Sequence, residues 1–452
     1  MIEYNNYKQV NGPKGTRFLG NLTDFQKNPL QFMSSLAREY EDVAQFRLGP
    51  FQNIFLVSSP ALIKEILVTK QKNFIKSKDL KVLKDLVGEG LLTSEKDFHL
   101  KQRRAIQPVF KHTHISKYAQ DMIDTTYSYT DQWISKEITQ VNEDMMNITL
   151  GIISKTMFSM EFDHGNEIIG HPLDTYMRLA VKRMRTLFPL PLWLPSKSNK
   201  RYKRAISDLD DVLYKIINSR KIGAENYNDL LGMLMAAKDD ESGVGMSDKQ
   251  LRDELMTIFL AGHETTGNAL TWAFYLLSKH PEIEQKLYDE INKVVGSRNI
   301  EPADFKQLKY TQNVVWETMR LFPPAYVIGR KVDHDVEIGD YYFKKGDMIL
   351  ISQYVMHRDS KYFYKPESFI PERFDNDFLK TIPDYTYFPF GGGPRVCIGN
   401  HFAVMEAVLV IACICQRFRL TLLDDHPAVL PQPLITLRPK RGLRMNIIKR
   451  EM

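Results

Sequence analysis

The sequence predicts a mainly α-helical single domain that carries small β-sheets. Three observations support this fold class: long helical patterns dominate the chain, strand-like runs cluster in two places, and no linker, repeat or low-complexity tract divides the 452 residues. Length alone would suggest about three domains. We instead expect one domain over 1–452, with a small β-rich N-terminal part at about 1–70 and a helical core at about 90–330 and 380–420.

The composition is that of a folded protein with enough apolar material for a core, since apolar residues make up 43% and charged residues 26%. The net charge of +6 is spread along the chain, and no Lys/Arg block resembles a nucleic-acid-binding arm. Cys397, Cys413 and Cys415 form neither a disulfide framework nor a paired metal site, which favours a reducing, cytoplasmic compartment. No run of about 20 apolar residues is present, so we expect no membrane span.

The strand-like runs lie at Val43–Val57 and Val332–Ser352. In the second run, Val336–Phe343 has the pattern of a hairpin, and Met348–Ser352 has the pattern of a further strand. We expect these runs to form the small sheets of the domain.

A long helix is predicted from Ser247 to Lys279. Ser247 and Gln250 have the spacing of a capping box, and His280-Pro281 ends the pattern. Two Gly and two Thr in the middle, in Ala261–Gly267, are poor choices for a buried helix. The Thr265 hydroxyl can bond the Ala261 carbonyl, and the small side chains leave room for a flat ring and a diatomic ligand. The alternative is a kinked helix with tolerated glycines.

A carboxylate and a guanidinium stand one helical turn apart at Glu317 and Arg320, in a helix that two prolines end. Pro371-Glu-Arg373-Phe374 follows downstream. A Glu-x-x-Arg pair alone arises by chance in a chain of this length, and an exposed surface pair is the alternative.

The most specific pattern is Phe390-Gly-Gly-Gly-Pro-Arg-Val-Cys397-Ile-Gly399. Its glycines allow positive φ and close backbone approach to a flat, bulky group, and Pro394 stiffens the loop. Backbone N–H groups around Cys397 can point at the sulfur and temper its charge. The pattern therefore predicts a loop that presents one thiolate to a metal centre. A buried cysteine in a Gly-rich turn is the alternative.

Phe390, Gly393, Arg395, Cys397 and Gly399 fall on the haem-binding signature of the cytochrome P-450 monooxygenases, which the chain resembles. The resemblance implies the fold of that family, a helical core that binds haem b, and Cys397 as the proximal ligand of the haem iron. An anionic sulfur ligand donates electron density to iron and favours cleavage of the O–O bond.

Ala261-Gly-His-Glu-Thr-Thr is similar to the oxygen-binding motif of the same family. The resemblance implies that Thr265 forms hydrogen bonds to the distal oxygen and that Glu264 relays protons from solvent, as general acid catalysis requires. Thr266 offers the same chemistry and ranks second. The resemblance also implies that Glu317, Arg320 and Arg373 form a buried network that fixes the loop of Cys397.

Haem carries two propionates, which require cations when buried. By position, Arg103, Arg395 and Arg330 are the candidates. His99 lies four residues before Arg103, on the same helix face, and the neighbouring Phe98 is the alternative occupant of this place. The expected cofactor-binding residues are therefore His99, Arg103, Ala261, Arg330, Phe390, Arg395 and Gly399.

The resemblance implies a separate ferredoxin or flavodoxin with its reductase as the source of electrons from NAD(P)H, because no flavin or iron–sulfur domain follows Cys397. A peroxide-driven enzyme is the alternative. The co-substrates would be O2 and an apolar molecule such as a fatty acid or terpenoid, contacted by Ile75–Leu92 and Met177–Leu194.

An apolar stretch at 187–195, followed by basic residues, is either a packed loop or a site of weak membrane contact. Two other classes of protein stay open. A haem-thiolate sensor or carrier would need no Glu264 and Thr265, and a cysteine-nucleophile enzyme could pair Cys397 with His401.

Overall fold

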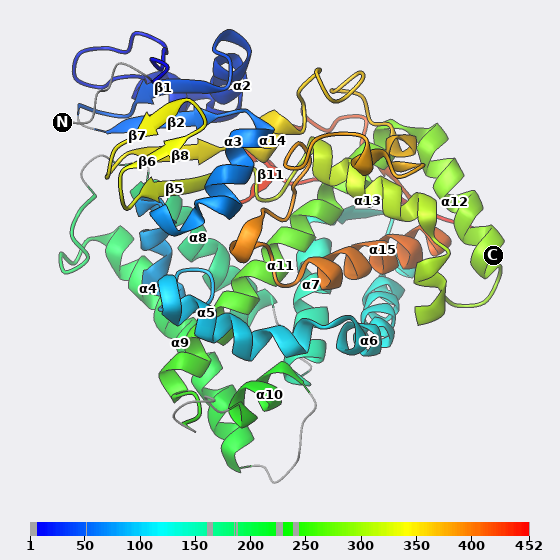
Figure 1. Cartoon of the computed structure of the whole chain (residues 1–452). Coiled ribbons are helices and arrows are strands. Elements are labelled where there is room, and N and C mark those ends of the chain that lie inside the picture. Colours follow the sequence, from blue (N-terminus) through cyan, green and yellow to red (C-terminus); the bar gives the residue numbers. More distant parts are fainter. Residues whose placement is uncertain are drawn as a thin grey trace.

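The computed structural model describes residues 7–50, 52–160, 166–184, 186, 189–222, 229–237 and 244–451. Helices fill most of the molecule, and the largest sheet lies at one end, at the upper left of Figure 1. This arrangement confirms the predicted fold class, mainly α with small sheets. The helices in the first half are α1 (Leu22–Lys27), α2 (Pro29–Glu39), α3 (Pro60–Lys64), α4 (Lys84–Val87), α5 (Lys96–Ile106), α6 (His112–Asp131), α7 (Val141–Phe158), α8 (His171–Met184) and α9 (Lys197–Ile222). Those that follow are α10 (Leu230–Ala236), α11 (Asp248–Lys279), α12 (Pro281–Val295), α13 (Lys309–Leu321), α14 (Gln353–Met356) and α15 (Asn400–Arg417).

The largest sheet has the strand order β1-β2-β8-β5-β3. It joins both strand-rich segments of the sequence, because β2 pairs in parallel with β8 while the other pairs are antiparallel. The predicted hairpin is present as β6 and β7, which pair with each other. The strands are β1 (Val43–Arg47), β2 (Asn53–Val57), β3 (Phe74–Lys76), β4 (Ile138–Gln140), β5 (Ile328–Val332), β6 (Val336–Ile338), β7 (Tyr341–Phe343), β8 (Met348–Ile351), β9 (Phe418–Leu422), β10 (Pro431–Pro433), β11 (Leu437–Pro439) and β12 (Arg444–Lys449).

Helix α11 crosses the centre of the molecule and packs against α7, α9, α13 and α15 (Figure 1). It ends at Lys279 as predicted, because Pro281 cannot continue it. The predicted capping box is only half formed. The Ser247 hydroxyl accepts from the Gln250 N–H, but the Gln250 amide donates to Glu254 instead of returning to Ser247.

Helix α15 begins after Gly399 and packs beside α11. Within the described ranges it alone is long and apolar enough to cross a membrane, and 78% of that stretch is buried inside the protein, as in a core helix. Cys413 and Cys415 lie within it and are buried as part of the core.

Candidate active site

The loop that carries Cys397 is held by its own backbone and by a neighbouring helix. The Cys397 N–H donates to the Phe390 carbonyl at 3.0 Å, which closes the loop. The Phe390 ring packs edge-on against Trp316 of α13, with ring centroids 6.2 Å apart. Gly399 precedes the first residue of α15, so the loop runs directly into that helix.

Gly393 is the residue that lets this loop lie close to the rest of the fold. Its φ is +65°, and a Cβ there would stand 1.9 Å from the Leu67 carbonyl oxygen. Leu67 belongs to the π-helical turn η2 (Glu65–Thr69), which follows α3. A side chain at position 393 would therefore push the loop away from η2.

Cys397 is exposed, and it is nevertheless surrounded by enough protein for burial to affect its thiol. Burial raises the pKa of its thiol, while the Gly399 N–H and the Arg103 guanidinium lower that pKa. Arg103 is well placed for this, since its Nη1 donates to the neighbouring Val396 carbonyl at 2.8 Å. The sulfur is thus open on one side and receives some stabilisation of its anionic form.

Four cationic side chains gather next to this loop. Arg395 donates to the Ser94 carbonyl and to the Glu95 carboxylate, each at 2.7 Å. Arg330 of β5 donates to the Gly329 carbonyl, and burial followed by the charge of Arg395 lowers its pKa to about 10. The structure thus brings together all three residues predicted to bind the haem propionates: Arg103, Arg330 and Arg395.

Lys76, at the end of β3, is the fourth cation and was not predicted from the sequence. Burial, and then the charges of Arg330 and Arg395, lower the pKa of Lys76 to about 7. Glu95 is the carboxylate that opposes this repulsion, and it also accepts from the Lys76 N–H at 2.7 Å. No motif marks Lys76 or Glu95, because their roles depend on strands and loops distant in sequence.

His99 of α5 faces the same cations. Its side chain is buried, and burial followed by Arg395, Lys76 and Arg103 lowers its pKa to about 3. The ring is therefore neutral near pH 7 and contributes hydrogen-bonding capacity and not charge. The alternative Phe98 is 41% exposed, so the structure favours His99.

Ala261 and Thr265 lie one turn apart on α11. The Thr265 hydroxyl donates to the Ala261 carbonyl at 2.5 Å, as predicted. Ala261 is exposed although most of α11 is buried, so the helix surface is open at this turn. Thr266 is buried and interacts with the buried carboxyl of Glu406 of α15, so it turns away from this surface.

Glu264, the predicted proton relay, lies in the protein interior. Its side chain is buried, and its Oε1 accepts from the Thr436 hydroxyl at 2.7 Å. Burial raises its pKa, and the Thr436 hydroxyl and the Arg438 charge lower it. Successive helical residues point about 100° apart, so Glu264 and Thr265 face different neighbours. Thr436 lies on the segment immediately before β11, and both side chains of this hydrogen bond are buried.

Glu317, Arg320 and Arg373 form one buried network. Arg320 donates to both Glu317 carboxylate oxygens, at 2.7 and 2.8 Å. Arg373 donates to Glu317 at the longer distance of 3.4 Å. Arg320 also donates to three carbonyls that lie before and within the segment leading to Arg373: those of His357, Pro366 and Ser368. The alternative of an exposed surface pair is wrong, because Glu317 and Arg320 are fully buried.

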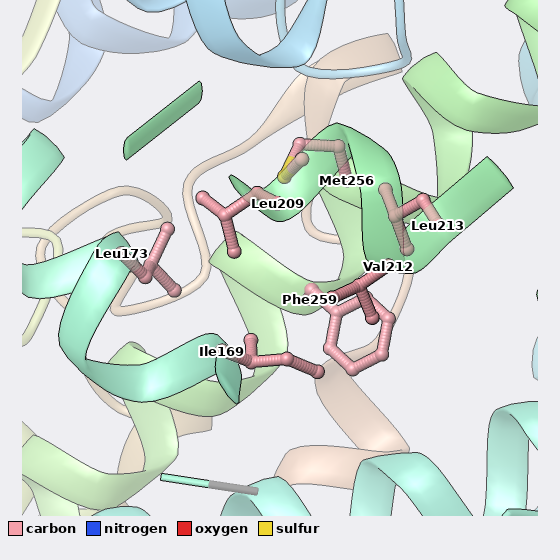
Figure 2. Close-up of a pocket in the computed structure, with 7 residues that line it drawn as sticks. All are labelled: Ile169, Leu173, Leu209, Val212, Leu213, Met256 and Phe259. Atoms are coloured by element: carbon pink, nitrogen blue, oxygen red, sulfur yellow. The ribbon is translucent and has the colours of Figure 1, made fainter. Parts of the chain in front are cut away.

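A small apolar cavity lies elsewhere, between α8, α9 and α11 (Figure 2). Leu173, Leu209, Leu213, Met256 and Phe259 are among its lining residues. Neither Cys397 nor Ala261 lines it, so it is separate from the site described above. Met256 and Phe259 nevertheless stand within two turns of Ala261, which gives this part of α11 an apolar setting.

Comparison with known proteins identifies the family. The cytochrome P450 family profile matches residues 10–445. Cyclooctatin synthase of Streptomyces melanosporofaciens is 34% identical over 433 residues, covering 95% of this chain and 94% of that protein. Cyclooctat-9-en-7-ol 5-monooxygenase of the same organism is 31% identical, covering 90% and 88%. Pentalenene oxygenase of Streptomyces avermitilis is 28% identical, covering 97% of both.

The chain belongs to the cytochrome P450 family, as its haem-binding pattern predicted. It forms one domain of that family and is a monooxygenase, an oxidoreductase that incorporates oxygen from O2. The family implies a haem-thiolate cofactor.

The residues present fit such a cofactor. Lys76, Arg330 and Arg395 repel one another, and Glu95 alone does not balance their charge. Two propionates would supply the negative charge that this cluster needs. Within the described ranges, no group of three or more His, Cys, Asp or Glu side chains could hold a bare metal ion. A porphyrin brings four nitrogen ligands of its own, so Cys397 can serve as a single protein ligand.

Proposed function

We propose that this enzyme binds haem b through Cys397 and inserts one oxygen atom of O2 into an apolar, terpenoid-like molecule. The cation cluster beside the exposed Cys397 carries this proposal, since a dianionic partner there would offset the charge that Glu95 alone does not balance. The names of three relatives contain cyclooctatin, cyclooctat-9-en-7-ol and pentalenene, which favours a cyclic hydrocarbon skeleton over a fatty acid.

Thiolate-ligated haem supplies the binding and reductive cleavage of O2. The chain's own residues would orient the cofactor and supply protons to the reaction. The Gly399 N–H and Arg103 favour the anionic form of the Cys397 sulfur and so oppose the burial that raises its pKa, and Lys76, Arg330 and Arg395 would hold the propionates. Because the Thr265 hydroxyl hydrogen points at the Ala261 carbonyl, its oxygen lone pairs are free to accept from a protonated group at the open helix surface.

The buried Glu264 carboxyl is the proposed store of the proton consumed at this surface. Its raised pKa keeps a larger protonated fraction at a given pH than an exposed glutamate has. Thr265→Ala is expected to lower product formed per NAD(P)H by at least about tenfold, with hydrogen peroxide released instead. Thr266→Ala is the matched control, since Thr266 faces Glu406. Equal coupling in both variants would contradict the role of Thr265.

The basic test of the site is spectroscopic. Reduced protein under carbon monoxide should show a strongly red-shifted Soret band, and Cys397→Ser should lose that shift. Product formation with a surrogate ferredoxin and reductase then separates an enzyme from a haem-thiolate sensor or carrier. A Soret band that is unchanged in Cys397→Ser would contradict the assignment, and so would a colourless protein.

A separate ferredoxin or flavodoxin with its reductase is the proposed source of electrons. Lys101 and Arg104 are exposed on α5, the helix that also carries Arg103 next to the Cys397 loop. An acidic donor that docks there would lie near the loop of Cys397, the residue that would ligate the haem. Arg104→Glu should slow reduction by ferredoxin at low salt, and the difference from the parent should shrink at high salt. A salt-independent difference would contradict this docking face.

Weak membrane contact is proposed for the loop before α9, together with a cytoplasmic location. Trp193 and Leu190 are 76% and 56% exposed, and the buried Asn199 holds their loop by donating to the Pro191 and Leu194 carbonyls. The exposed residues Lys197, Lys200, Arg201 and Arg204 of α9 follow at helical spacing. Three residues of the predicted substrate segment Met177–Leu194 lie outside the described residues: Arg185, Leu187 and Phe188.

Sedimentation with vesicles tests this contact. Binding is expected to phosphatidylglycerol-containing vesicles and not to pure phosphatidylcholine, and Trp193→Ser should weaken it. Ile222→Ser is the control, because Ile222 is 87% exposed at the far end of α9. Equal loss in both variants, or equal binding to both kinds of vesicle, would contradict the proposal.

A further inference from the structure

Two consecutive acids, Asp253 and Glu254, are buried in the second turn of α11. The two residues are 1% and 0% exposed, although neither belongs to the candidate active site described above. Carboxylates are buried at a cost unless donors satisfy them. The partners of these two residues therefore show what the burial achieves.

Both acids accept hydrogen bonds from the backbone of the loop between α4 and α5. The Glu89 N–H donates to Asp253 at 3.0 Å, and the Leu91 N–H donates to Glu254 at 2.9 Å. Gly90 lets the loop reach the helix, because a Cβ there would stand 2.2 Å from the Thr257 hydroxyl and 2.5 Å from the Asp253 carbonyl oxygen. The loop is thus bonded directly to α11.

The remaining oxygens of the two acids are also satisfied. Arg252 and Lys249 donate to Asp253 at 2.9 and 2.8 Å, and the Gln250 amide donates to Glu254 at 2.9 Å. Arg252 reaches in addition to Asp210 of α9 at 2.6 Å. The tether therefore has fixed geometry and connects the loop, α11 and α9.

The tethered loop stands between the open turn of α11 and the cation cluster. Residues 253, 257 and 261 follow at intervals of four on one face of α11, so the Gly90 contact lies one turn before Ala261. At its other end, the Leu92 carbonyl accepts from Lys76 and the Ser94 carbonyl accepts from Arg395. Leu91 and Leu92 are half-buried against the main core between these two ends.

We propose that Asp253 and Glu254 are positioning residues that fix residues 88–92, part of the predicted substrate segment Ile75–Leu92, as one wall of the substrate site beside Ala261. Leu91 and Leu92 are the apolar, half-buried side chains of this wall, so its position would affect the binding of apolar substrates long enough to reach it. The inference rests on the proposed haem site, because Ala261 is taken to face the substrate there. The tether itself does not depend on haem.

Glu254→Leu removes the acceptor of the Leu91 N–H, and Glu254→Gln restores a carbonyl oxygen at the same place. Gly90→Ala displaces the loop from its own side without changing either acid. Glu290→Leu is the matched control, because Glu290 accepts the Tyr310 and Thr311 N–H groups at 2.6 and 2.9 Å far from the site. All are measured as haem-loaded protein.

The probes are 1-dodecylimidazole, whose tail would contact the wall, and imidazole, which is too small to do so. Binding is read from the Soret shift, and amide hydrogen exchange is followed over residues 88–92. Glu254→Leu and Gly90→Ala are expected to weaken the binding of dodecylimidazole about tenfold, the effect of losing or displacing one buried contact. The same variants should change the binding of imidazole less than about twofold. Exchange at Leu91 should rise in both, whereas Glu254→Gln and Glu290→Leu should resemble the parent.

Equal weakening of both azoles would overturn the proposal, and so would faster exchange with unchanged dodecylimidazole binding. If Glu254→Leu fails to fold, the comparison of Gly90→Ala with Glu254→Gln still tests whether the position of the loop controls dodecylimidazole binding. A parent protein with no Soret response to imidazole would instead overturn the haem site, and exchange at Leu91 would still report whether the tether exists.

Discussion

The buried network of Glu317, Arg320 and Arg373 allows a quantitative test of how the Cys397 loop is supported. Arg320→Met removes five hydrogen bonds: two to Glu317 and three to the carbonyls of His357, Pro366 and Ser368. It leaves the Glu317 carboxylate with the Ile370 N–H at 3.0 Å and the distant Arg373. Breaking a buried pair from one side costs about 3–5 kcal/mol of unfolding free energy, and we expect Arg320→Met to lie in that range.

Arg373→Met should cost less, about 1–2 kcal/mol, because Arg373 contributes hydrogen bonds only at 3.4 Å, to Glu317 and to the Lys365 carbonyl. Lys286→Met is the surface control. Its pair with Glu372 is 2.7 Å long but 59% and 39% exposed, so the expected cost is about 0–1 kcal/mol.

The assay is urea unfolding of the haem-loaded protein, followed by circular dichroism and by the Soret band. Both signals should shift together for Arg320→Met, because the network supports the segment that leads to Cys397. The reasoning would be refuted if Arg320→Met cost less than about 1 kcal/mol, or less than Arg373→Met.

Three further predictions concern the loop, the cations and pH. Gly393→Ala should abolish haem incorporation at unchanged helix content, because its Cβ would meet the Leu67 carbonyl. Gly296→Ala is the control, because Gly296 has a similar φ of +64° and open space around it. A normal ratio of Soret to 280 nm absorbance in Gly393→Ala would contradict the inference that this glycine lets the Cys397 loop lie against Leu67. Arg395→Ala should speed haem transfer to apomyoglobin, since it removes a cation that is proposed to bind a propionate; an unchanged rate would count against this role of the cation cluster. Burial raises the pKa of Glu254 from its ordinary 4.5 to about 7, so the folded state binds this proton more tightly than the unfolded chain. Its contribution to stability is therefore complete below about pH 4.5 and is lost as pH rises to 7, by up to about 3 kcal/mol, and Glu254→Gln should flatten the unfolding free energy across that window.

Much of the site could be predicted from local patterns. The Phe390–Gly399 loop, the Thr265 bond to Ala261 and the end of α11 at Pro281 all depend on residues within about ten positions of one another, where spacing and backbone chemistry decide the structure. The Glu317 and Arg320 pair was also readable, since one helical turn separates them.

Other features could not be predicted, because their partners are far away in sequence. The side chain that Glu264 contacts is Thr436, 172 positions later, and this contact places the acid in the interior instead of toward solvent. Lys76 joins Arg330 and Arg395 only because β3 pairs with β5 and because Glu95 binds the Cys397 loop. Neither the burial of Glu264 nor the position of Lys76 is marked by a pattern in the nearby sequence.

The sequence by itself determined the family, the Cys397 loop and the Ala261–Thr265 turn of α11, because these are encoded by short spacings of unusual residue types. The tertiary structure decided which charges are buried and what satisfies them. Asp253 and Glu254 read as ordinary polar residues near a helix start, yet they bind a loop more than 160 positions earlier. The physical reason is that burial and hydrogen-bond satisfaction are properties of packed neighbours, which periodicity along one segment does not specify.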